Sequence, residues 1–324
     1  MPLRRLALVL TLVVAALSGA AAPAHASADL VRAPRACDGC PAPVPCRGGC
    51  WTPAADLRWQ IQLQWVKGFC PTGGINTAVT APPFTGGTPV TPTVIAMDMY
   101  ADSDHCSYGP STANKPAVDA VHTAGGFAIA YVDAGTWERW RPDAGAFVAF
   151  DHRCGGCLLG KTLGGFPDER YVNIHDPAER RFLLQRMRLR MKKAAGAGFD
   201  GVYFDNQDEY HWAATGFPIT RHDQLMYLTR LANIAHRLGL AAGPNNDILQ
   251  TGKFQPYVDL QVNESCFRYS ECGYMRPMLT AGKPILEIEY GAAPSTFCRK
   301  ANALGIDSIR KSPDLYDLPW VPCR

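Results

Sequence analysis

From about residue 59 onward, short apolar runs alternate with longer stretches in which apolar residues recur every three or four positions. A short apolar run predicts a buried strand, and the longer period predicts a helix. The helical stretches cover residues 115–124, 177–197, 222–238 and 275–281. The expected strands cover residues 59–64, 94–99, 127–132, 201–205, 240–243, 258–262, 285–289 and 306–309.

This alternation indicates an α/β fold with a parallel sheet. Eight strands separated by helices favour a single (β/α)8 TIM barrel over residues 57–324. The alternative is a doubly wound open sheet, but the chain has no Gly-x-Gly-x-x-Gly turn. The connection over residues 133–173 is long for one βα unit, so we expect it to be functional or to cover the barrel.

Residues 1–26 have the pattern of a secretory signal peptide. A basic start is followed by an apolar stretch over residues 6–22, and Ala24-His25-Ala26 fits a cleavage site. A membrane anchor is the alternative, but the apolar stretch is short and no other run approaches about 18 apolar residues. We therefore expect a secreted protein that is not attached to a membrane after signal cleavage.

Residues 27–56 are rich in Ala, Pro, Cys and Gly and show no periodicity, which predicts a linker or a small cysteine-stapled extension. The chain has twelve cysteines, and an even number in an exported protein indicates disulfides before metal ligands. Zinc remains the alternative for Cys37-x-x-Cys40 and Cys154-x-x-Cys157. We expect Cys266 to pair with Cys272, because five intervening residues can form a closed turn. No metal or cofactor is expected.

Composition excludes two other classes of protein. Hydrophobic residues make up 47% of the 324 residues, enough for a large core, which excludes wholesale disorder. The formal net charge is +3, and removal of the signal peptide with Arg4 and Arg5 leaves about +1. This near balance argues against a nucleic-acid partner, because no basic stripe is present to neutralise phosphates. We expect a monomer.

The carboxyl ends of the predicted strands carry an unusual number of acids. In a barrel these ends form the face that holds the active site. A buried carboxylate is costly to keep charged without partners, so acids at six of eight strand ends indicate function more than packing. The acids include Asp98, Asp133, Glu138, Asp205, Asp247, Glu264 and Glu289, and nearby aromatic residues include Tyr131, Tyr269 and Tyr290.

Acids and aromatic rings around one pocket suit a sugar, whose faces stack on rings and whose hydroxyls bond to carboxylates. Two acids flanking a glycosidic bond are the minimum for its hydrolysis. Asp205 and Glu264 are the best pair, because each directly follows an apolar strand. Each also has an asparagine neighbour, Asn206 or Asn263, that could orient the substrate or the carboxylate.

The chain resembles glycoside hydrolase family 114, whose members include endo-α-1,4-polygalactosaminidases. The resemblance extends over residues 59–310, and its Asn-Glu-x-Cys segment is quite specific. The matching positions are Trp59-Gln60-Ile61-Gln62-Leu63, Asp98, Tyr131, Gly135, Glu138-x-Trp140-Arg141-x-Asp143, Glu169-Arg170, Gly198-Phe199-Asp200-Gly201-Val202, Asp205-Asn206, Asn245-Asn246-Asp247, Asn263-Glu264-x-Cys266-x-x-Tyr269-x-Glu271-Cys272 and Glu289-Tyr290.

The resemblance implies a (β/α)8 glycosidase that cleaves α-1,4-linked galactosamine polymers. It places the catalytic carboxylates at Asp205 and Glu264, and it places Asp98, Asp247 and Glu289 along the sugar-binding cleft. Family members often have lysine where this chain has Asn245, which removes a positive charge from the cleft. An acidic rim also makes physical sense for a polymer with free amines, because carboxylates attract a polycation.

We expect a retaining reaction in which Asp205 is the nucleophile and Glu264 the general acid and then the base. An inverting reaction would use the same pair with a water between them. A metal-dependent polysaccharide deacetylase is one alternative, since Asp205, Asp208 and His211 have a plausible ligand spacing. A non-catalytic secreted carbohydrate-binding barrel is another, although both catalytic acids are present.

Overall fold

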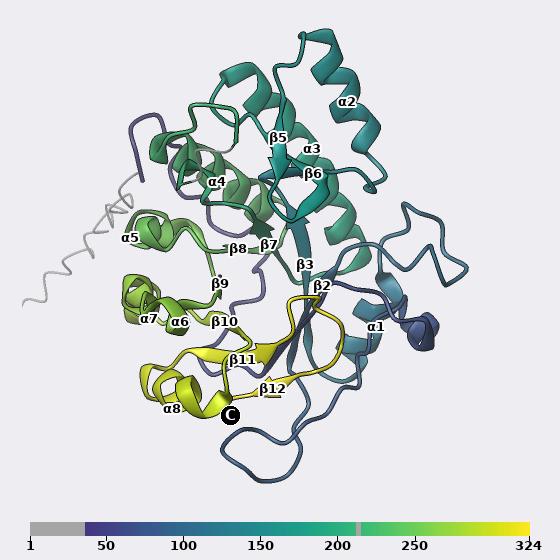
Figure 1. The fold of residues 1–324 in the computed structure, drawn as a ribbon, viewed down its shortest axis with the longest axis vertical. Helices are drawn as coiled ribbons and strands as arrows, with labels where there is room; N and C mark the ends of the chain where they lie inside the picture. The colour runs from purple at the N-terminus through teal and green to yellow at the C-terminus, as the bar shows by residue number, and fades with distance from the viewer. Residues whose placement is uncertain (1–35, 212–214) are drawn as a thin grey trace, which may run out of the picture. The chain divides into compact units, whose positions relative to one another are not determined.

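The computed structural model describes residues 36–211 and 215–324, so the expected signal peptide lies outside the described residues. Eight parallel strands form the centre of the fold (Figure 1). They occur where the apolar runs predicted them, with shifts of up to three residues at their ends. These strands are β1 (Trp59–Gln62), β2 (Val94–Asp98), β3 (Phe127–Asp133), β7 (Gly201–Asp205), β8 (Ala241–Pro244), β9 (Gln261–Glu264), β10 (Ile285–Tyr290) and β11 (Asp307–Lys311).

The eight strands make the (β/α)8 barrel in two hydrogen-bonded sheets. One sheet has the order β1-β2-β3-β7-β8, and the other has the order β9-β10-β11 with the antiparallel β12 (Val321–Pro322) at its edge. A parallel bridge between Asn245 and Val262 links β8 to β9. Between β11 and β1, the indole N–H of Trp59 donates to the carbonyl oxygen of Asp307 over 2.6 Å. The predicted fold class is confirmed.

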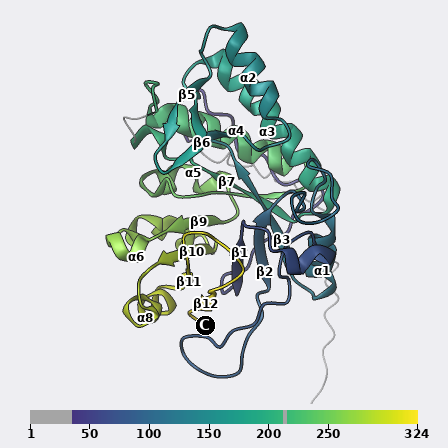
Figure 2. The same ribbon diagram turned by 45° about the vertical axis from the view of Figure 1, so that its right-hand side comes forward.

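The longer helices cover the outside of the strands (Figure 2). They are α1 (Lys115–Thr123), α3 (Pro177–Ala197), α4 (Arg221–Arg237) and α8 (Pro294–Leu304). Local sequence sets their ends: Thr220 and Asp223 form a capping box at the start of α4, and Gly198 ends α3 in a left-handed conformation. The short helices α5 (Thr251–Phe254), α6 (Cys266–Tyr269) and α7 (Arg276–Thr280) follow β8 and β9.

Apolar side chains pack on both sides of the strands. Inside the barrel, Trp59, Ile129, Tyr203 and Ile288 belong to one buried cluster. A larger cluster lies between the strands and the helices and includes Phe204. Burial on both faces explains why the strands read as continuous apolar runs rather than as an alternating pattern.

The long connection after β3 contains a small sheet of its own. It consists of β4 (Thr136–Glu138), α2 (Ala144–Arg153), β5 (Leu159–Leu163) and β6 (Phe166–Val172), with antiparallel strands in the order β4-β6-β5. Gly135 begins this connection, and a Cβ atom there would lie 1.9 Å from the carbonyl oxygen of Asn206. Only glycine permits this approach, which holds the connection against the residue that follows β7.

The described part of the N-terminal extension packs at the amino ends of the strands, opposite the ends that carry the predicted acids. The amide of Val44 donates to the side chain of Asn233, and the ring of Trp51 stacks on Phe127, the first residue of β3. The disulfides Cys37–Cys40 and Cys46–Cys50 each close a short loop within the extension. The proposed domain boundaries, with residues 27–56 as an extension and residues 57–324 as the glycosidase domain, stay a prediction.

Six disulfides account for all twelve cysteines, and the expected Cys266–Cys272 bridge is confirmed. Both Cys-x-x-Cys pairs are closed as bridges, so the zinc alternative for them is wrong. The remaining bridges are Cys70–Cys106, which joins the loops after β1 and β2, and Cys298–Cys323, which joins α8 to the C-terminus. Across residues 36–211 and 215–324, no helix is long and apolar enough to cross a membrane.

Candidate active site

Asp205 and Glu264 end β7 and β9, and a single strand, β8, separates them. Asn245 directly follows β8, and its side-chain nitrogen donates to Oδ1 of Asp205 over 2.8 Å and to Oε1 of Glu264 over 2.9 Å. These two carboxylate oxygens therefore lie within about 5.7 Å of each other, the combined length of the two bonds. The structure brings together the pair that the sequence selected.

Each carboxylate also has a tyrosine partner. The hydroxyl of Tyr131, on β3, donates to Oδ2 of Asp205 over 3.1 Å. The hydroxyl of Tyr290, at the end of β10, hydrogen-bonds to Glu264. Tyr131 and Tyr290 were both expected at the site, and the structure places both against the acid pair.

Burial raises the pKa of Glu264 to about 7, and the nearby charge of Asp205 acts in the same direction. The hydrogen bonds from Asn245 and Tyr290 oppose this rise because they stabilise the ionised form. Glu264 therefore holds a proton for a substantial part of the time at neutral pH. Such a group can protonate a leaving oxygen.

The backbone turns sharply just after each strand of the site. Asn206, Asn246, Asp247 and Ser265 all have positive φ, with values of 55°, 58°, 49° and 64°. Asparagine and aspartate tolerate this left-handed conformation, whereas serine adopts it less readily. Each turn directs the chain away from the strand that precedes it. Asp205 and Glu264 therefore stay at the carboxyl end of the barrel, which we call the mouth.

A buried ion cluster lies beside Asp205. The Arg141 guanidinium makes a two-bond contact with Glu138, over 2.6 Å at both Nε and Nη2, and reaches Asp98 over 2.7 Å. Its side chain is 5% exposed. The same guanidinium lies 5.5 Å from the centre of the Tyr131 ring, so it also holds the tyrosine that bonds to Asp205.

Other predicted sugar-binding residues have protein partners. Asn206 donates to Asp133 and Asn263 donates to Asn246. Tyr210 and Gln250 donate to Asp247, and the backbone amides of Phe267 and Arg268 donate to Glu289. Tyr269 is 60% exposed. Asp98, Glu138, Asp247, Asn263 and Glu289 are buried in these contacts, and their predicted role in sugar binding stays a prediction.

Sequence reasoning missed a second pair of acids, Asp133 and Glu169, which meet at the hydroxyl of Thr136. The hydroxyl of Thr136 lies 2.5 Å from Asp133 and 3.0 Å from Glu169. A hydroxyl has one proton, so one of the two carboxyls must be protonated to donate to it. Burial raises the pKa of Glu169 to about 7 and the pKa of Asp133 well above its usual value. The sequence placed Asp133 at a strand end and Glu169 among the positions that match the family, but it gave no sign that the two acids meet.

The sequence spacing of Asp205, Asp208 and His211 suggested a metal site, but the structure does not bring these three residues together as ligands. Within the described ranges, the one close group of three potential ligands is Cys154, Cys157 and Glu179, and its two cysteines are bridged. Asp205, Asp208 and His211 do not form such a group.

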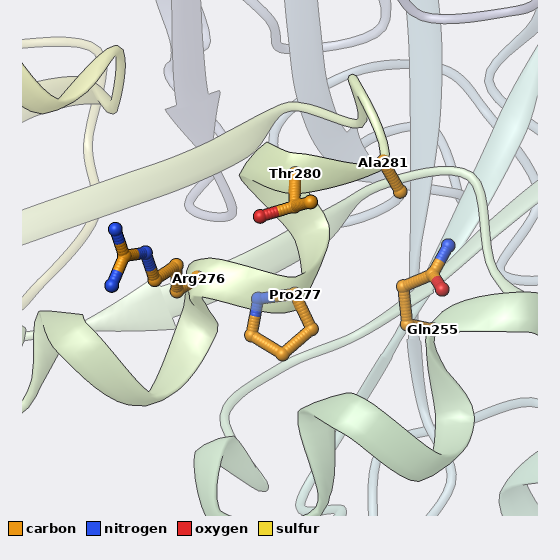
Figure 3. Close-up of a pocket in the computed structure, with 5 residues that line it drawn as sticks. All are labelled: Gln255, Arg276, Pro277, Thr280 and Ala281. Atoms are coloured by element: carbon orange, nitrogen blue, oxygen red, sulfur yellow. The ribbon is translucent and has the colours of Figure 1, made fainter.

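A hollow of the surface lies away from these acids (Figure 3). It is lined by Gln255, Arg276, Pro277, Thr280 and Ala281. This lining contains no carboxylate, so it offers none of the groups that glycoside hydrolysis requires.

Replacement of Arg141 by methionine tests the ion cluster. Arg141→Met leaves the buried Asp98 without its cation and leaves Glu138 with only the 3.8 Å contact to Arg190, which is expected to lower the free energy of unfolding by about 3–5 kcal/mol. Arg139→Met is the matched control, because Arg139 forms an exposed pair with Asp168, and its loss is expected to cost less than about 1 kcal/mol. Urea denaturation measures both. Equal effects would contradict the role of the buried cluster.

Comparisons with known proteins show the family of this chain. The model of glycoside-hydrolase family GH114 matches residues 41–324. The crystal structure of Aspergillus fumigatus Ega3 in complex with galactosamine is similar, with a TM-score of 0.66 and 25% identity over 85% of this chain and 97% of that one. The glycoside hydrolase domain of Pseudomonas aeruginosa PelA shares the fold, with a TM-score of 0.50 and 13% identity over 83% and 98% of the two chains. No curated protein matches. The chain belongs to glycoside hydrolase family GH114 and is a glycosidase.

Proposed function

We propose that the protein is a secreted, endo-acting hydrolase of α-1,4-linked galactosamine polysaccharide, with Asp205 and Glu264 as its catalytic pair. The observation that carries this proposal is the pair of carboxylates at the ends of β7 and β9, bonded to one amide nitrogen. The galactosamine bound to Ega3 supports the substrate class. Six disulfides support secretion, because such bridges persist in oxidising compartments. The enzyme acts as a monomer.

In the mechanism that we propose, Asp205 attacks the anomeric carbon while Glu264 gives its proton to the leaving glycosidic oxygen. The glycosidic bond breaks, and a covalent bond from the sugar to Asp205 forms. Glu264 then removes a proton from water, which displaces Asp205 and restores both groups. The upper bound of about 5.7 Å between the nearest oxygens supports this retaining course, since inverting enzymes need about 6.5–9.5 Å to hold a water.

The acid pair also offers a reason for a cationic substrate. The charges of Asp205 and Asp208 both act on Glu264, and Arg141, which lies against Tyr131, is buried in ion pairs. A polymer with free amines is attracted to such a surface, whereas an acidic polymer is repelled.

Product analysis tests the reaction and its residues together. The mature protein is expected to release short fragments from de-N-acetylated α-1,4-galactosamine oligomers, with acetylated oligomers and chitosan tested in parallel. Asp205→Asn and Glu264→Gln are each expected to reduce turnover by at least about 1,000-fold, since each removes a group that reacts in the transition state. Mass spectrometry of the products gives the result.

Asp168→Asn is the matched control for this experiment, because Asp168 pairs with Arg139 at an exposed position of β6. This variant is expected to keep the wild-type rate. Near-wild-type turnover by both Asp205→Asn and Glu264→Gln would contradict the assignment of these two residues as the catalytic pair. Binding of the polymer without cleavage by the wild-type protein would favour a non-catalytic carbohydrate-binding barrel instead.

Product stereochemistry tests the role of Asp205 separately. A retaining reaction on an α-linked polymer is expected to give α-anomers first, with β-anomers appearing only as the sugars mutarotate. Proton NMR spectra recorded within the first minutes of the reaction distinguish the two. Initial β-anomers would show that the same pair activates a water instead.

The pH dependence of kcat/KM tests the role of Glu264. Because burial raises its pKa to about 7, the group carries the proton needed for catalysis below this pH and loses it as the pH rises. The rate is therefore expected to fall by half near pH 7 and by about tenfold for each further pH unit. Initial rates between pH 5 and pH 9 measure this. A profile that stays flat up to pH 9 would contradict Glu264 as the general acid.

A further inference from the structure

Asn245 occupies the junction between the two sheets of the barrel. It directly follows β8, its backbone amide donates to the carbonyl oxygen of Phe204 over 2.7 Å, and it bridges to Val262 on β9. The residue is 3% exposed. Its backbone is thus held from both sides, and its side chain is aimed between the ends of β7 and β9.

The two carboxylates fix the orientation of the amide. A carbonyl oxygen placed between the oxygens of Asp205 and Glu264 would be repelled, so the NH2 group must face them. Both of its N–H bonds are used, one for each acid. The carbonyl oxygen of Asn245 is buried and has no hydrogen-bond partner among the described residues. Such an unpaired acceptor is costly, so the amide contributes to the site through its two donors.

We propose that Asn245 is a positioning residue that sets the distance between Asp205 and Glu264 and, because it is uncharged, does so without placing a cation between them. This inference rests on the proposed function, in which the two acids form the catalytic pair. Neither tyrosine makes this bridge in the described structure, because the hydroxyl of Tyr131 bonds to Asp205 and that of Tyr290 bonds to Glu264. Asn245 alone bonds to both acids within the described part of the chain.

The groups around Glu264 give the direction of the expected effects. Asp205 and Asp208, at the end of β7, raise its pKa, and the Tyr290 hydroxyl on β10 lowers it. The buried phenol of Tyr203 also faces it from β7. The Asn245 hydrogen bond from β8 lowers the pKa of Glu264 without adding a charge. Removal of the amide therefore raises this pKa, whereas a lysine at the same position lowers it.

The test compares the pH dependence of kcat and KM for Asn245→Ala and Asn245→Lys with that of the wild-type enzyme on galactosamine oligomers. In Asn245→Ala we expect kcat to fall by about 100-fold with little change in KM, because the acids lose their fixed spacing. The high-pH limb of the profile moves upward in Asn245→Ala and downward by about one pH unit in Asn245→Lys. If Asn245 had a purely structural role, the high-pH limb of the profile would stay at the wild-type pH in both variants. This result would overturn the proposal.

Asn302→Ala is the matched control, because this asparagine lies on α8 and donates to the carbonyl oxygen of Cys323, so its side chain bonds to neither acid of the pair. It is expected to keep the wild-type pH profile. Thermal unfolding checks that each variant folds. If Asn245→Lys does not fold, the direction of the shift in Asn245→Ala decides alone, and a downward shift or none overturns the proposal.

A second readout separates this inference from the proposed function. Carbon NMR of labelled glutamate, with Glu264→Gln used to assign the signal, follows the titration of Glu264 without any substrate. A wild-type protein that cleaves no polymer would defeat the proposed function, whereas the Glu264 titration would still move in Asn245→Ala and Asn245→Lys if the amide sets it. A titration midpoint that is the same in all three proteins overturns the positioning role.

Discussion

Two carboxylates that bond to the same amide nitrogen repel each other when both are ionised, and the surroundings of Asp205 and Glu264 reflect this constraint. Repulsion of this kind favours the protonated form of a carboxyl that lies beside a second carboxylate. Here burial and the neighbouring charge raise the pKa of Glu264. Glu264 can therefore hold a proton beside Asp205, and acid catalysis next to a nucleophile requires such a proton.

The same constraint explains how much buried polar structure supports the mouth. Tyr131 holds Asp205 from one side, and Arg141 holds Tyr131 by lying against its ring. Arg141 is in turn fixed by Asp98 and Glu138, which come from β2 and β4. The long connection after β3 is thus part of the support for the site, because it supplies both Glu138 and Arg141.

The sequence was sufficient to predict the barrel, because buried parallel strands are short apolar runs and are separated by helices that have their own period. It also predicted Asp205 and Glu264, since both directly follow such runs. The sequence could not predict side-chain contacts between distant segments. Asp98 and Arg141 are 43 residues apart, and Asp205 and Asn245 are 40 residues apart. The small sheet of β4, β5 and β6 was also missed, although β5 and β6 are neighbours in the chain and pair directly across residues 163–166. For Glu289 the strand-end position was evident, but its bonds to the amides of α6 were not.

The C-terminus lies at the end of the barrel opposite the acid pair. Arg324 forms ion pairs with Asp56 and with Asp307, the first residue of β11, and the C-terminal end is marked in Figure 1. A support or carrier protein attached through a spacer after Arg324 would therefore leave the mouth turned outward. Immobilised in this way, the protein would keep Asp205 and Glu264 facing the solution.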